Sequence, residues 1–130
     1  MTTEGSDSHW IETYRSLVTL SIEGFKFAAL ANGGAAVALL AYLGNAAGKG
    51  SRAPDVSCAM AAFLAGLVAC GLALLFAYFT QLKLLNESRD GVRPKFSHDW
   101  LLWSAIASFS FSLVSFAFGS YQAVIAFRIA

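Results

Sequence analysis

The chain has 130 residues, of which 57% are hydrophobic and 13% are charged, and its formal net charge is +1. A soluble domain of this size needs more polar residues to cover its surface, so this composition excludes an ordinary water-soluble protein. The near-neutral charge, without a dense basic stripe, also argues against a nucleic-acid-binding protein. The composition therefore indicates that lipid surrounds much of the chain.

Three long stretches contain no Asp, Glu, Lys, Arg or His: residues 27–48, 56–82 and 100–127. About 20 apolar residues in a helix cross the ~30 Å hydrocarbon layer of a bilayer, so each stretch is long enough to span it. Backbone in that layer must be helical or part of a closed barrel, and the alternating strands of a barrel are missing. We predict an all-α integral membrane protein whose three-helix transmembrane domain, residues 27–130, has spans at about 27–46, 56–82 and 100–127.

Residues 1–26 are predicted to form a polar amino terminus followed by an amphipathic helix. Apolar side chains recur there at helical spacing, and the charged side chains fall largely on the other side. The apolar face comprises Trp10, Ile11, Tyr14, Leu17, Val18, Ile22 and Phe25, with Ser21 among them. This helix can lie in the headgroup plane after a bend at Gly24, or extend the first span as a stalk that packs on a partner. We favour the headgroup position.

Local signals also predict where the other helices begin and end. The second helix is expected to open at Pro54 and Asp55, because proline is tolerated in the first turn and a carboxylate is favourable at the amino end of a helix. It is expected to end near residue 86, before a polar loop that reaches residue 98. Trp100 and Trp103 then mark the membrane interface at the start of the third helix.

Lys and Arg residues are distributed unequally between the two sides of the membrane. With three spans, the amino terminus and the loop between the second and third spans lie on the same side of the membrane. That side has six Lys and Arg residues, and the other side has three. Short segments rich in Lys and Arg stay cytoplasmic, so we expect a cytoplasmic amino terminus and an external carboxyl terminus. The expected location is the inner membrane of a bacterial cell.

The second span carries two rows of small residues at intervals of four, and such rows let membrane helices approach closely. One row comprises Ala61, Ala65, Ala69, Ala73 and Ala77, and the other comprises Cys58, Ala62, Gly66 and Cys70. The first span offers matching surfaces that include Gly33 and Gly34. These rows either hold the chain's own helices together or leave one row free to form a homo-oligomer, and both alternatives stay open.

Five of the polar residues within the spans are candidates for a polar lining: Asn32, Ser104, Ser108, Ser112 and Ser115. In lipid such side chains usually bond within their own helix or to a neighbouring helix, which favours a packing role. The alternative is that they line a small pore. No charged residue accompanies them inside the spans, which argues against a proton relay or an ion-coupled transporter.

The residue patterns of catalytic and cofactor sites are missing from the sequence. It has no phosphate-binding glycine loop, nucleophile elbow or set of metal ligands, so we expect no catalytic residue, no cofactor and no metal. The leading hypothesis is a small non-enzymatic membrane protein that self-associates through its Ala/Gly rows and forms a pore or a membrane-perturbing assembly. The alternative is an accessory or anchoring subunit of a larger membrane complex. Both have the lipid bilayer as a partner.

Overall fold

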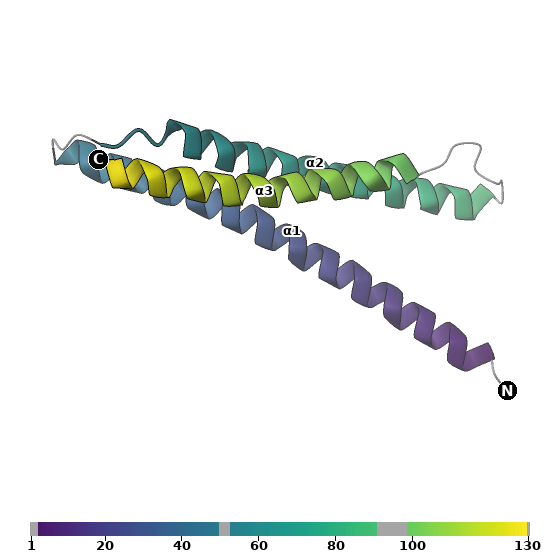
Figure 1. Ribbon diagram of the computed structural model, residues 1–130. Helices are drawn as coiled ribbons and strands as arrows, with labels where there is room; N and C mark the ends of the chain where they lie inside the picture. Colours follow the sequence, from purple (N-terminus) through teal and green to yellow (C-terminus); the bar gives the residue numbers. More distant parts are fainter. Residues whose placement is uncertain (1–2, 50–52, 91–98, 130) are drawn as a thin grey trace.

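The computed structural model describes residues 3–49, 53–90 and 99–129, which form three α-helices (Figure 1). These are α1 (Thr3–Gly48), α2 (Ser57–Asp90) and α3 (Asp99–Ile129). The described ranges contain no strand, and each helix includes a stretch long and apolar enough to cross a bilayer. The prediction of an all-α membrane protein with three transmembrane helices is therefore confirmed.

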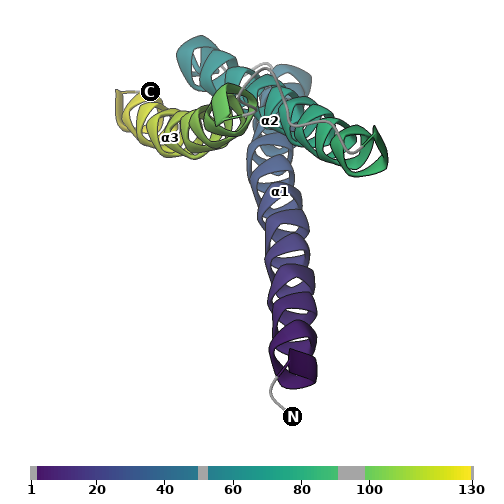
Figure 2. The same cartoon turned by 90° about the vertical axis from the view of Figure 1, so that its right-hand side faces the viewer.

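The helices form an up-down-up bundle that opens at one end. α2 and α3 lie side by side and make the most extensive contact, whereas α1 and α3 make the least. The carboxyl-terminal half of α1 lies against this pair, and its amino-terminal half diverges from them (Figures 1 and 2). The amino terminus and the end of α2 lie at one end of the molecule, and the carboxyl terminus lies at the other (Figure 1).

α1 is a single uninterrupted helix of 46 residues, so residues 3–26 are continuous with the first span. The favoured bend at Gly24 is not formed, because the helix runs on through this residue. A Cβ atom at Gly24 would lie 3.5 Å from Cζ of Phe109 in α3, which is an ordinary van der Waals contact, so α1 and α3 are neighbours at this point without requiring a glycine. In the structure this segment therefore continues directly into the first span as one helix.

The ends of the helices differ from their predicted positions in small ways. α2 begins at Ser57 and not at Pro54, because Asp55 caps it from outside: its Oδ1 accepts a hydrogen bond of 3.0 Å from the Ser57 backbone N–H. Hydrogen bonds from the Ser57 hydroxyl and backbone lower the pKa of the Asp55 carboxyl. α2 then continues to Asp90, past the predicted end near residue 86, and most of the predicted second loop lies outside the described residues.

A cluster of buried apolar residues lies toward the end of the bundle where α1 leads into α2. It comprises Ala36, Leu39, Val56, Ala59 and Phe63. Many large apolar side chains of all three helices point outward: Leu30 of α1, Val68 of α2 and Val114 of α3 are 75%, 64% and 64% exposed. An apolar exterior is unstable in water but matches lipid tails, so the distribution of side chains agrees with the membrane location.

Candidate functional site: a polar junction between the three helices

Asn32 lies where α1, α2 and α3 meet, and its side chain is fully buried. Its Nδ2 donates to the Ala28 carbonyl one turn earlier in α1 at 3.0 Å. The same nitrogen contacts Ser112 of α3, at 3.3 Å from its carbonyl oxygen and 3.2 Å from its Oγ. An amide is costly in an apolar interior unless it is bonded, so these contacts tie α1 to α3.

The third side of the junction is Gly66 of α2, which is also buried. A Cβ atom at Gly66 would lie 2.7 Å from Cγ of Asn32 and even closer to its Oδ1. Only glycine therefore lets α2 approach this amide. Among the described residues, Oδ1 of Asn32 is a buried side-chain atom that has no hydrogen-bond partner. It faces the Gly66 backbone.

The polar residues predicted as a lining are drawn into the bundle. Ser112 and Ser115 are buried, and Ser104 and Ser108 are half-buried. Beyond them on α3, Gln122 donates from Nε2 to Sγ of Cys58 in α2 at 3.2 Å. The structure thus brings Asn32 and Ser112 together directly and places the other three serines along the same helix without a shared site.

The two rows of small residues in α2 are divided between the interior and the exterior. Gly66, Ala69 and Ala73 are buried, Ala62 is half-buried, and Ala61 and Ala65 are exposed. In α1, Gly33 is half-buried, with Cδ1 of Leu67 3.9 Å from the position of an added Cβ, and Gly34 is exposed. A row at intervals of four turns by about 40° per step around the helix, so one neighbour cannot cover all of it.

A second close approach was not predicted from the sequence. Gly119 of α3 is buried against Phe63 of α2, and a Cβ atom there would lie 2.8 Å from Cε1 of the ring. The spacing Ser115-x-x-x-Gly119 is a small-residue pair of the same kind as those noted in the other spans, and it was the available signal. α1 and α2 also meet where the Cys70 thiol donates to the Phe25 carbonyl at 3.5 Å.

The junction has no ionisable side chain of its own, and its groups are an amide, a hydroxyl and a glycine backbone. The described residues also contain no group of three or more His, Cys, Asp and Glu side chains arranged to hold a metal ion. This arrangement can hold helices together, and it offers neither a nucleophile with a base nor a ligand set. Comparison with protein-family models, curated proteins and solved structures found no match for this chain.

Proposed function

We propose that this membrane protein is a non-enzymatic anchoring subunit, in which the bundle holds the chain in the bilayer and the amino-terminal half of α1 binds a partner protein. The observation that carries the proposal is the length of α1. At ~1.5 Å per residue its 46 residues extend about 69 Å, roughly twice the ~30 Å hydrocarbon layer. About half of the length of α1 is therefore not needed to cross the bilayer.

Residues 9–24 lie in this surplus part and are called the stalk below. Its apolar side chains are widely exposed: Trp10 is 72% exposed, Leu17 58% and Leu20 66%. Trp10, Tyr14 and Leu17 continue the face of α1 that farther along contacts α2 and α3 through Phe25, Ala28 and Asn32. The bond from the Tyr14 hydroxyl to Oε1 of Gln81, 3.0 Å long, still links the stalk to α2.

An exposed apolar helix face of this kind is stabilised when another apolar surface covers it, at roughly 25 cal/mol per Å² of buried area. The polar side of this part of α1 carries equal acid and base up to residue 26, since Glu12 and Glu23 are balanced by Arg15 in the stalk and by Lys26 just after it. Lipid-binding helices usually carry an excess of Lys and Arg on this side. The balance favours a protein partner over an anionic lipid surface as the cover.

Site-specific photocross-linking in native membranes tests this proposal. A photoreactive amino acid at Leu17, on the apolar face, should give a discrete adduct with a second polypeptide. The same amino acid at Thr19, whose hydroxyl bonds to the Arg15 carbonyl within its own helix, is the matched control and should give none. Adducts with lipid alone at Leu17 would contradict the anchoring function and would indicate that the stalk lies in the headgroup plane.

Self-association is a second candidate function, and the exposed residues Ala61 and Ala65 favour it. They form a free small-residue pair on α2, whereas Gly66, Ala69 and Ala73 are already used within the chain. Replacing both alanines with Leu should convert an oligomer into a monomer, as measured by mass in nanodiscs. A wild-type chain that is monomeric would remove this candidate.

A pore lined by the polar residues has less support. Asn32, Ser112 and Ser115 are buried inside one bundle, where the first two bond to each other. Opening a water path along them would break those contacts. We expect no current from reconstituted protein, and a current that changes in Ser112→Ala would overturn this expectation.

The orientation is proposed from the Lys and Arg count, with the amino terminus in the cytoplasm of a bacterial cell and the inner membrane as its location. Cysteines introduced at Thr13 and Lys49, in a chain whose Cys58 and Cys70 are replaced by Ala, lie toward opposite ends of α1. An impermeant maleimide added to whole cells should label position 49 and spare position 13. The reverse pattern would invert the topology.

A further inference from the structure

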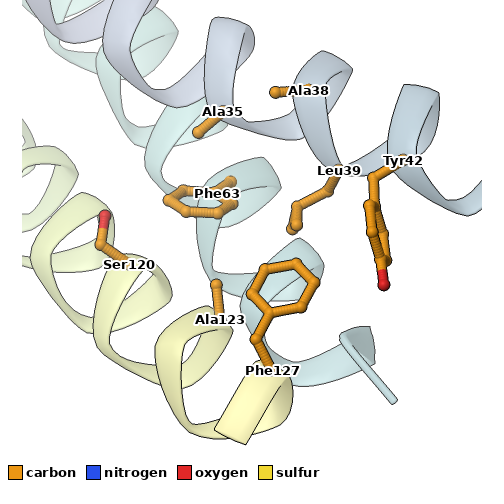
Figure 3. A pocket seen from close by; sticks show the side chains of 8 residues that line it. All are labelled: Ala35, Ala38, Leu39, Tyr42, Phe63, Ser120, Ala123 and Phe127. Carbon is orange, nitrogen blue, oxygen red and sulfur yellow. The ribbon is translucent and has the colours of Figure 1, made fainter. Parts of the chain in front are cut away.

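An open apolar groove of about 370 Å³ lies between α1 and α3, toward the carboxyl-terminal end of both helices (Figure 3). Phe63 of α2 forms its floor, and Leu39 of α1 and Phe127 of α3 point into the same space (Figure 3). Ala38 and Ala123 leave the groove wide because their side chains are small. It lies within the transmembrane stretches of all three helices, where hydrocarbon is the surrounding solvent.

The groove has an aromatic rim and almost no polar wall. The rings of Tyr42 and Phe127 meet edge to face, with their centroids 5.0 Å apart. The hydroxyl of Ser120, the one serine that lines the groove, donates to the Phe116 carbonyl at 2.8 Å within its own helix. The lining therefore matches a hydrocarbon chain and offers few bonds to a polar ligand.

Two exposed cations lie near the end of the groove. Lys49 follows Tyr42 by seven residues, just past the end of α1, so it lies about 10 Å farther along the chain direction of that helix. Arg128 follows Phe127 directly in α3, so its side chain leaves the helix at the level of the aromatic rim and about 100° around it. The acidic group described at this end, Asp55, accepts hydrogen bonds from Ser57. Basic side chains at the membrane surface attract anionic headgroups.

We propose that this groove binds one acyl chain of an anionic phospholipid, whose phosphate lies near Lys49 and Arg128. The apolar groove and the two cations follow one another along the helices in the order in which a phospholipid carries its tail and its headgroup. A second copy of the chain is a poorer occupant, because two such cations would then face a protein surface or each other without a matching charge. This inference requires only the membrane bundle and is independent of any partner of the stalk.

Native mass spectrometry of the purified chain, titrated with phosphatidylglycerol or phosphatidylcholine, tests the proposal. Ala38→Trp fills the groove from α1, and Ala41→Trp, on an exposed face of the same helix outside the groove, is the matched control. One phosphatidylglycerol should stay bound to the wild type and to Ala41→Trp. Its affinity should fall at least about tenfold in Ala38→Trp. Equal retention by all three proteins would overturn the proposal.

The headgroup part has its own variant. Lys49→Gln combined with Arg128→Gln should bring the affinity for phosphatidylglycerol down to that for phosphatidylcholine. A wild type that binds the two lipids equally would contradict the role of the cations. If Ala38→Trp does not fold, the wild type still serves: phosphatidylglycerol with a photoreactive acyl chain should label peptides that contain Tyr42, Ala123 or Phe127. Labelling confined to other surfaces, or a mass that shows a second chain in this place, would overturn the site.

Discussion

The middle of α1 and its stalk belong to one helix and are both rich in apolar residues, but their surroundings are opposite. Ala28, Asn32 and Ala36 are at most 6% exposed, whereas Trp10 and Leu20 are 72% and 66% exposed. Small side chains let α2 and α3 approach the middle of α1. The larger side chains belong to the stalk, where α1 diverges from α2 and α3 (Figure 1). In a membrane protein, the size of the contacting residues matters more than their hydrophobicity in deciding which helix surfaces pack together.

The largest effect is expected where an added side-chain atom does not fit between the helices at the polar junction. Gly66→Ala inserts a Cβ atom against the Asn32 amide, and we expect it to lower the free energy of unfolding by about 1–3 kcal/mol. Gly71→Ala in the same helix is the matched control, because an added Cβ there meets nothing within 4 Å. Reversible unfolding in mixed micelles measures both variants.

Combining Gly66→Ala with Asn32→Ala identifies the cause of that loss. If the clash is with the amide, removing the amide recovers part of the stability, and the coupling between the two sites should be about 0.5–3 kcal/mol. Additive effects would show that α2 does not rest on Asn32.

Gly119→Ala is expected to have a somewhat smaller effect of about 1–2 kcal/mol, because the obstacle is the edge of a ring that can tilt. The ring belongs to Phe63, which is 3% exposed and part of the core. Gly34→Ala, where an added Cβ meets nothing within 4 Å, is the control. Phe63→Leu should make Gly119→Ala better tolerated, and an unchanged loss in that background would place the strain elsewhere.

The Asp55 cap at the start of α2 is expected to make the stability of the packed region depend on pH. The pKa of Asp55 in the folded chain lies below its ordinary value of 3.8, so its hydrogen bonds stabilise the fold above that pH and are lost as the pH falls through the folded-state pKa. Asp55→Asn keeps a capping side chain but cannot ionise. Its stability should nearly match the wild type at pH 7 and depend less on pH below about 4. Identical pH profiles for the two proteins would contradict the role of this carboxylate.

The smallest effect is expected in the stalk. Leu17→Ser and Leu20→Ser each remove an exposed side chain, so the free energy of unfolding of the bundle should change by no more than about 0.5 kcal/mol. The same unfolding assay measures this, with Leu39→Ser in the core as the sensitive comparison. A loss above about 1 kcal/mol from either stalk variant would mean that the stalk folds onto the bundle and that the contrast does not hold.

The spans were predictable because charged residues interrupt the sequence where the chain leaves the lipid. Helix ends were less predictable: α1 and α2 continue beyond the uncharged stretches, since a helix ends where its backbone bonds and caps end. Within the candidate site, the polarity of Asn32 and the small size of Gly66 indicated a role in packing. The outward position of Ala61 and Ala65 was hidden, because sequence spacing does not show which part of a winding row meets a neighbour.

The three bonds of Asn32 also bear on the order in which the chain assembles. α1 is synthesised first, and its amide already has an acceptor in its own helix, the carbonyl of Ala28. The two acceptors on Ser112 emerge from the ribosome 80 residues later. An isolated α1 is thus tolerable in the bilayer, and the second N–H of its amide, which still lacks an acceptor, becomes a driving force for α3 to dock in a single register.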